Sequence, residues 1–304
     1  MKKMNKYICL LLLLVGFAQI DAKEENYSQM SITELDAAFI SAVKKYRLEE
    51  LQELIQAGAN VNTPIPYTWT SGDCDWQIES TALIYAVRQH CPDMVKVLLK
   101  VDKNLNEALD LAIKEGYSDV VEELIKGKAD INSVNKDEDT PLITAIKHAR
   151  ATAEFSLQAQ ERARSRWSQR QKIIQTLIKA GANVNHVNKF GRTALMEAVK
   201  EHDLHTVQSL LQVPEIYSGS FFGFGTKPLN YADKDGNTAL ILAIQSVRYR
   251  YTNKQEHNIC TNSQNIIKAL FETPGIDPHH VNNNGDTAIT LLEELKTKMN
   301  GYPY

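Results

Sequence analysis

The residue types that most often do chemistry in proteins are sparse in this chain and form no catalytic set. Two pairs of histidines lie close in sequence, His202 with His205 and His279 with His280. Neither pair comes with the cysteine or carboxylate spacing of a zinc site. The sequence also lacks the Gly-x-Ser-x-Gly, phosphate-loop, His-Glu-x-x-His and Cys-x-x-Cys motifs. We therefore expect no enzyme activity, no metal and no cofactor.

A basic stretch indicates a different chemistry, the binding of phosphate groups or of an acidic partner. It lies around Trp167 and comprises Arg150, Arg162, Arg164, Arg166, Arg170 and Lys172. Glu154 and Glu161 interrupt it, as on the solvated face of a helix, and the whole chain has a formal net charge of −3. We interpret the stretch as such a face and predict no nucleic-acid partner.

Aromatic residues are the sharpest candidates for contact with a protein partner, because Tyr and Trp are enriched among the residues that dominate interface energies. The candidates lie in two stretches and are Tyr67, Trp69, Trp76, Phe221, Phe222 and Phe224. The alternative is that these side chains fold back and cover apolar surface of their own segments.

The elements that carry these residues follow from a pattern that repeats along the chain. A threonine followed by apolar residues and an alanine occurs in 140–146 and in 193–199. Related copies begin at Thr81, Glu107, Thr238 and Thr287. An apolar triplet follows each alanine at a constant offset, so each copy contains two helical segments with one apolar face each. The threonine is expected to cap the first of them.

The ends of the copies also recur. A Gly-Ala-Asn-Val-Asn string follows the second helix at Gly58 and at Gly181, and glycine can adopt the left-handed conformation that ends a helix. A degenerate first copy starts near Ala37, which gives about seven copies. The spacing from Glu107 to Thr140 is 33 residues. This period and the text of residues 111–125 resemble the ankyrin repeat, and the resemblance covers roughly residues 31–300.

The resemblance implies an all-α ankyrin-repeat solenoid of about seven helix-turn-helix repeats with β-hairpin-like fingers and insertions. Members of this family bind partners on a concave surface lined by the fingers. Two of the intervals between consecutive copies are long because residues are added between helix pairs, which predicts enlarged fingers near 62–80 and 213–231. Two other intervals are long because residues are added inside a helix pair, which predicts extended helix hairpins near 146–173 and 245–266. In the hairpin near 146–173 we expect both helices to lengthen by about ten residues.

The first residues have the layout of a secretory signal peptide. Lysines at positions 2, 3 and 6 precede an apolar run over 7–18, and Ala22 is a small residue suited to cleavage. The expected domains are a signal peptide (1–22), a linker (23–30), the repeats (31–300) and a tail (301–304). Removing three lysines and Asp21 with the leader changes the net charge from −3 to −5. An uncleaved anchor is the alternative, although the run is shorter than the about 20 residues that span a bilayer.

Three cysteines remain after such a cleavage, Cys74, Cys91 and Cys260. An odd number argues against a disulfide framework, and repeats far apart in an array are beyond disulfide reach. We expect three free thiols.

These features predict an exported, non-catalytic protein-binding module that acts through its concave finger surface. We expect it to be periplasmic or secreted, monomeric and not inserted in a membrane, with a role in host or envelope interaction and a protein partner. The alternative is a structural or self-associating scaffold that uses the two helical extensions.

Overall fold

The structure is a computed structural model. It describes residues 27, 30–71, 74–101, 104–148, 157–217, 228–252 and 257–300. These residues form two compact units. The first contains the described residues up to Leu111 together with Lys126–Lys128, and the second contains Ala112–Ile125 and the described residues from Ala129 onward.

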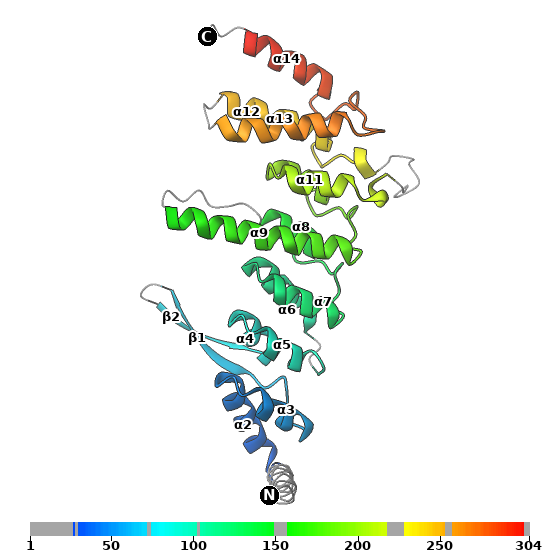
Figure 1. The fold of residues 1–304 in the computed structure, drawn as a ribbon. Helices are drawn as coiled ribbons and strands as arrows, with labels where there is room; N and C mark the ends of the chain where they lie inside the picture. Colours follow the sequence, from blue (N-terminus) through cyan, green and yellow to red (C-terminus); the bar gives the residue numbers. More distant parts are fainter. Residues whose placement is uncertain are drawn as a thin grey trace, which may run out of the picture. The chain divides into compact units, whose positions relative to one another are not determined.

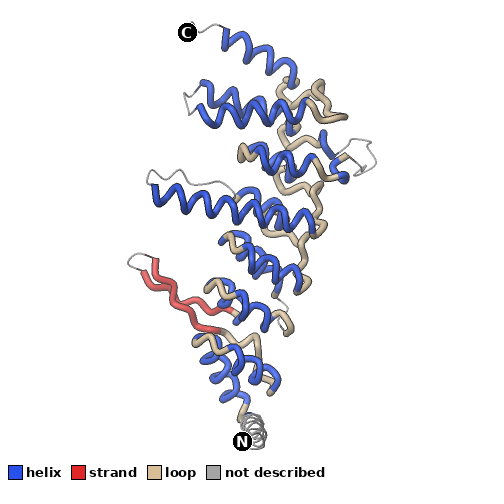
Figure 2. The backbone as a smooth tube through the Cα atoms, in the orientation of Figure 1, coloured by secondary structure: helices blue, strands red, loops and turns tan. Residues whose placement is uncertain are grey.

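The first unit consists of helix pairs and one β-hairpin (Figures 1 and 2). Its elements are α2 (Ile32–Lys44), α3 (Leu48–Gln56), β1 (Ile65–Ser71), β2 (Cys74–Ser80), α4 (Ala82–Arg88) and α5 (Pro92–Leu98). Helix α2 packs against α3 and α4, and α5 packs against α3 and α4. The antiparallel strands β1 and β2 connect the first helix pair to the second and contact α4 at their base.

The second unit stacks helix pairs in two rows. Its helices are the end of α6 (Leu105–Glu115), then α7 (Ser118–Lys126), α8 (Pro141–Lys147), α9 (Leu157–Lys179), α10 (Ala194–Lys200), α11 (Leu204–Leu211), α12 (Ala239–Thr252), α13 (His257–Phe271) and α14 (Ala288–Asn300), with short 3-10 helices η1 (Pro214–Ile216) and η3 (Pro228–Asn230). Helices α8, α10, α12 and α14 pack in one row, and α9, α11 and α13 pack in the other. The last copy in the described residues contributes α14 alone.

Threonine caps begin the short helices of the first row, as the pattern predicts. The hydroxyls of Thr81, Thr140 and Thr193 each accept a hydrogen bond from the backbone N–H three residues later. The helices that follow have seven residues each, which is too short to be stable in isolation. Nearly all of their side chains are buried, so their stability comes from packing between copies.

The second helix of a copy ends at a left-handed glycine where the sequence predicts one, and in one copy a lysine takes this conformation. Gly181 has φ 86°, and the next N–H, from Ala182, donates to the carbonyl of Leu177 at 3.0 Å, which is the Schellman arrangement. In the preceding copy Lys128 occupies the equivalent place with φ 67°. A Cβ on Gly127 would lie 2.6 Å from Cδ2 of Leu99. The glycine of this copy therefore serves close packing, and the lysine takes the left-handed conformation.

The position near Ala37 that matches the repeat pattern lies inside α2. The helix begins earlier, at Ile32, because Ser31 and Glu34 form a capping box. One expectation about the helix extensions is wrong. The extension near 146–173 is not shared between two helices. Helix α8 ends at Lys147 with His148 as its C-cap, whereas α9 has 23 residues. In contrast, α12 and α13, with 14 and 15 residues, are both long and pack against each other.

The apolar positions that the pattern assigns to the core are buried. Leu98, Leu124, Leu177 and Leu210 each have 0 % relative exposure. Among the described residues, no helix has both the length and the apolar character needed to cross a membrane.

A polar network joins α9 to α11. Asp203 is the N-cap of α11, and its carboxylate accepts from the N–H of Thr206 at 3.0 Å and from the Thr206 hydroxyl at 2.6 Å. The same carboxylate accepts from the side-chain amide of Gln171 in α9. Gln171 and Thr206 are buried, with 6 % and 0 % exposure. Gln171 and Thr206 also contact each other at 3.3 Å. This arrangement holds α9 against α11, because the buried donors of both helices make their shortest hydrogen bonds to one carboxylate.

Candidate protein-binding surface

Four similar turns join consecutive copies of the second unit. Each begins with an Asn or Asp, namely Asn135, Asn188, Asp233 and Asn282. The side-chain oxygen of this first residue accepts from the backbone N–H groups of the second and fourth residues after it, at 2.8 to 3.1 Å. The sequence forms these turns because a short carboxylate or amide can satisfy its own nearby backbone.

Backbone hydrogen bonds connect each turn to the next. The N–H groups of Lys189, Lys234 and Asn283 donate to carbonyl groups of the preceding turn at 3.1 to 3.2 Å. The fit is close at Gly236, where φ is 76° and an added Cβ would lie 2.8 Å from the N of Asn283. We call this row the turn ladder. It gives the loops of the second unit fixed positions relative to one another.

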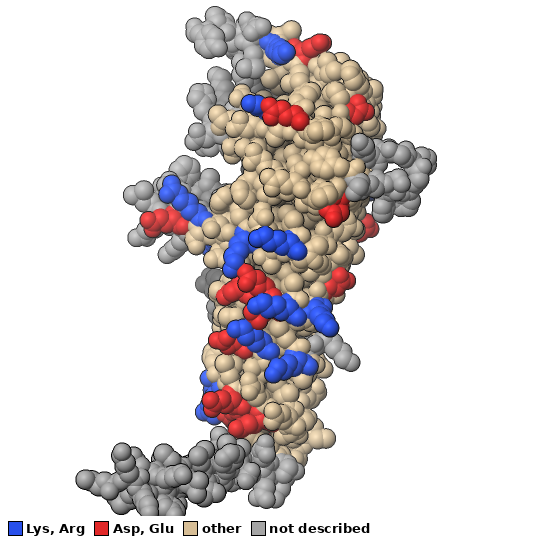
Figure 3. Space-filling model, turned by 45° about the vertical axis from the view of Figure 1, so that its right-hand side comes forward, with Lys and Arg blue, Asp and Glu red and all other residues tan. Residues whose placement is uncertain are grey.

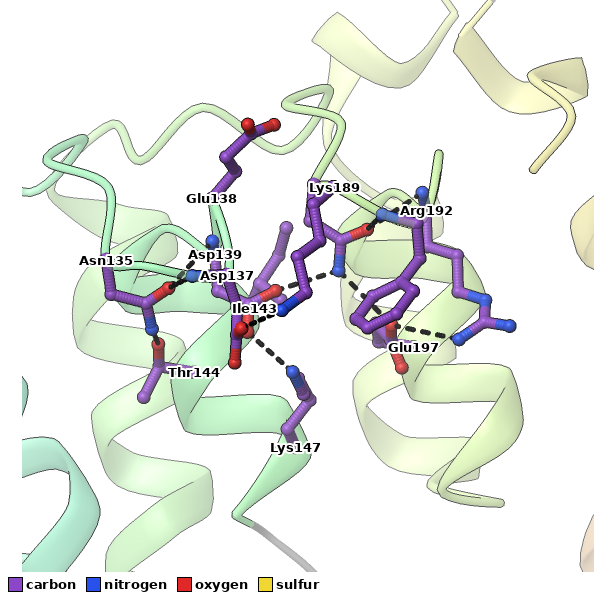
Figure 4. Close-up of polar contacts among 12 residues, drawn as sticks. Asn135, Asp137, Glu138, Asp139, Ile143, Thr144, Lys147, Lys189, Arg192 and Glu197 are labelled. Carbon is purple, nitrogen blue, oxygen red and sulfur yellow. Dashed lines mark hydrogen bonds and ion pairs between the residues drawn. The ribbon is translucent and has the colours of Figure 1, made fainter. Parts of the chain in front are cut away.

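Buried carboxylates lie beneath exposed cations around the first two turns (Figure 4). Asp139 and Glu197 have 3 % and 2 % relative exposure. The Lys147 Nζ lies 2.6 Å from a carboxylate oxygen of Asp139, and the Lys200 Nζ lies 3.4 Å from one of Glu197. The lysine side chains keep 30 % and 37 % exposure. The charge that solvent meets at these pairs is therefore mainly positive.

An aromatic ring lies among these cations. Phe190 is 41 % exposed, although it belongs to a polar turn. The Nζ atoms of Lys147 and Lys189 lie 5.9 and 5.1 Å from its ring centroid, and the Cζ of Arg192 lies 5.4 Å from it. These distances are within the range of cation–π attraction. We call the residues Phe190, Lys147, Lys189 and Arg192 the Phe190 surface.

The electrostatics of this surface hold its ion pairs in the charged form. The hydrogen bond from Lys189 holds the pKa of Asp137 below its ordinary value. Burial of Lys147 lowers its pKa, but the hydrogen bond to Asp139 and the nearby carboxylate charges outweigh that effect and raise the pKa overall. The ion pair of Asp137 stabilises the folded state until the pH falls through the lowered pKa of this carboxyl group. The ion pair of Lys147 stabilises the folded state until the pH rises through the raised pKa of this ammonium group. Both pairs are therefore intact at neutral pH.

The aromatic residues predicted from sequence are only partly within the described chain. Tyr67 and Trp69 lie on β1 and Trp76 lies on β2, where Trp69 pairs with Trp76 in the register and Tyr67 pairs with Ile78. At the base of the hairpin, Ile65 is fully buried. Phe221, Phe222 and Phe224 lie outside the described residues.

The basic stretch predicted from sequence is divided between internal contacts and solvent. Arg170 donates to the carbonyl of Lys114 at 2.9 Å, and burial, followed by the charge of Arg166, lowers its pKa. Lys172 pairs with Glu122 at 2.8 Å. On the face drawn in Figure 3, basic and acidic side chains lie next to one another. This mixture does not favour a phosphate backbone as the partner.

The histidine pairs have structural contacts. His202 Nδ1 lies 2.9 Å from the hydroxyl of Ser263, and His205 Nδ1 lies 2.9 Å from Oε1 of Gln171. His205 also meets Trp167 edge to face, with ring centroids 6.1 Å apart. Throughout the described part of the chain, no group of three or more His, Cys, Asp or Glu residues is placed to hold a metal ion.

Comparisons with known proteins agree with the helix pairs and the turns. Residues 163–253 match the family model "Ankyrin repeats (3 copies)", and residues 104–136 match the model "Ankyrin repeat". The fold is the ankyrin-repeat fold. Among solved structures, the ankyrin repeat domain of Bcl-3, described as a unique member of the IkappaB protein family, is similar with a TM-score of 0.56 and 21 % identity, over 84 % of this chain and 92 % of that one. No curated protein sequence matches the chain.

Ankyrin repeats are generally protein-interaction modules. The sequence interpretation missed the Phe190 surface. The available signal was the composition of the turns, because the third residue of each ankyrin turn is Asp137, Phe190, Asp235 or Asn284. Phe190 is the single apolar residue at this otherwise polar position.

Proposed function

We propose that the chain is an exported, non-catalytic protein-binding module with a role in host or envelope interaction, and that its finger edge contacts the partner. The observation that carries the proposed contact is the register of the β1–β2 hairpin. Trp69 opposes Trp76 and Tyr67 opposes Ile78, and strand residues two apart share a face. One face of the hairpin therefore collects aromatic and aliphatic positions.

The other face of the hairpin is polar in sequence. Thr68 pairs with Gln77, and Thr70 pairs with Asp75. A two-stranded ribbon is marginally stable in water by itself, and large aromatic residues are the commonest hot spots of protein interfaces. Contact with a partner on the aromatic face accounts for both the composition and the length of the finger.

Replacing Trp69 with Ala should remove most of the partner from a pull-down, because one hot-spot residue contributes about 2 kcal/mol or more. The measurement is a pull-down with the purified protein as bait, in which the captured proteins are quantified by mass spectrometry. Thr70→Ala is the matched control on the polar face and should leave capture unchanged. Equal capture by both variants, or a lower melting temperature with unchanged capture, would contradict the proposal.

Export is proposed from the lysine-led apolar segment, which lies outside the described residues. If Ala22 precedes the cleavage site, protein recovered from the exported fraction of an expressing bacterial culture should begin at Lys23. Intact-mass spectrometry measures this directly. Leu12→Arg, which breaks the apolar run, should leave the protein unprocessed inside the cell. Recovery of a chain that starts at Met1 outside the cytoplasm would argue for an uncleaved anchor or another route.

Self-association through α9 is the second candidate. The described side chains of Arg164, Arg166 and Gln169 are exposed, and Trp167 is 42 % exposed. This part of α9 is thus accessible to a second copy. Light scattering separates the two functions, because a scaffold of this kind has at least twice the mass of one chain.

A further inference from the structure

The Phe190 surface combines an exposed aromatic ring with cations whose counter-ions lie mainly beneath the surface. Asp139, Glu197 and Asp233 have 3 %, 2 % and 6 % relative exposure. The side chains of Lys147, Lys189 and Arg192 keep 30 %, 41 % and 20 %. Asp137, which pairs with Lys189, is the exception, because its side chain keeps 46 % exposure. At Lys147 and Arg192 a partner meets the cation before the buried carboxylate that pairs with it.

The lysines retain hydrogen-bonding capacity. An ammonium group has three N–H donors. Lys147 uses one on Asp139, and Lys189 uses one on Asp137. Each can therefore donate to a further carboxylate without releasing the internal one. These carboxylates, buried at Asp139 and exposed at Asp137, also hold the lysines in place, which reduces the ordering cost of binding.

We propose that the Phe190 surface binds an acidic peptide segment of a protein partner. Carboxylates of the segment accept hydrogen bonds from Lys147 and Lys189, and an apolar side chain between them packs on the ring of Phe190. The proposal rests on the protein-binding function proposed above, but it concerns the second unit and does not depend on the β1–β2 hairpin.

The charge balance favours a peptide over a nucleic acid. The carboxylates of Asp137, Asp139, Glu197 and Asp233 offset the nearby cations, so the formal charge at long range is close to neutral. Binding of a phosphate backbone depends on that long-range field. Hydrogen bonds between a peptide carboxylate and a single lysine form at short distance, and they depend much less on the long-range field.

Fluorescence anisotropy of a labelled peptide tests the proposal on the full purified chain. The probe is a synthetic peptide with a central leucine flanked on both sides by glutamates, and the comparison probe has lysines in place of the glutamates. The acidic probe should bind, and the basic probe should not. An unlabelled oligothymidine should fail to compete.

Two variants and a matched control locate the site. Phe190→Asn should weaken binding about fivefold or more, since it removes the aromatic contact, and Asn284 shows that this turn position accepts asparagine. Lys189→Gln should weaken binding about threefold. Lys234 occupies the same position in the next turn, beside Asp235 in place of Phe190, so Lys234→Gln should leave binding unchanged.

Several results would overturn the inference. One is a Phe190→Asn variant that melts normally and binds the acidic probe with unchanged affinity, and another is an equal loss of affinity in Lys189→Gln and Lys234→Gln. The others are that the basic probe binds as well as the acidic probe, or that oligothymidine displaces the acidic probe. Trp69→Ala should bind the acidic probe as the unmodified protein does. A loss there would show that the two surfaces are not independent. If the pull-down with Trp69→Ala contradicts the proposed role of the hairpin, the peptide affinities still test the Phe190 surface separately.

Discussion

Replacing Leu124 with Ala should lower the free energy of unfolding by about 2 to 5 kcal/mol, because a fully buried leucine loses its contacts and leaves a cavity. Leu124 in α7 has 0 % relative exposure, and its carbonyl accepts the hydrogen bond from Ala129 that ends the helix. Urea denaturation followed by circular dichroism measures the change.

The comparison for this variant is Val134→Ala in the second unit. Val134 is 54 % exposed, so its truncation should change the unfolding free energy by less than about 0.5 kcal/mol. A loss below 1 kcal/mol for Leu124→Ala would show that the packing around α7 relaxes to fill the space, or that the leucine is not buried in solution.

Replacing Asp203 with Ala should cost about 2 to 4 kcal/mol. The variant loses the N-cap of α11, and the buried donors of Gln171 and Thr206 keep only their longer contacts with each other. Asp203→Asn keeps one side-chain oxygen for the cap and should cost less. Hydrogen exchange measured by mass spectrometry should show the loss concentrated in α9 and α11.

Equal and small effects of Asp203→Ala and Asp203→Asn would mean that water satisfies the two donors once the carboxylate is gone. A uniform rise in exchange across the second unit would show that the network stabilises the whole stack and not one interface.

The sequence was sufficient to predict the parts of the fold that depend on local chemistry. The ankyrin-repeat fold, the threonine caps and the left-handed glycine at Gly181 are confirmed. The prediction that the extension near 146–173 is shared between two helices was wrong. The offset between copies gives the total number of added residues, but it does not tell which of the two helices contains them.

The candidate surface was harder to predict, because it depends on residues that meet only in space. Lys147 is the last residue of α8, whereas Lys189 and Arg192 belong to the turn that begins at Asn188, after α9. Their approach to Phe190 is set by the turn ladder and by the burial of Asp139. Phe190 is a single aromatic residue in a polar turn, whereas the aromatic residues of the sequence that indicate a binding surface are grouped in 67–76 and 221–224.

The turn ladder also bears on the shape of a partner. Each of the last three turns donates one backbone N–H to the turn before it, so equivalent positions recur regularly along the row. The side chains at those places differ, with acids at Asp137 and Asp235, a ring at Phe190 and an amide at Asn284. An extended segment laid across the row would therefore be selected for the order of its side chains as well as for its length.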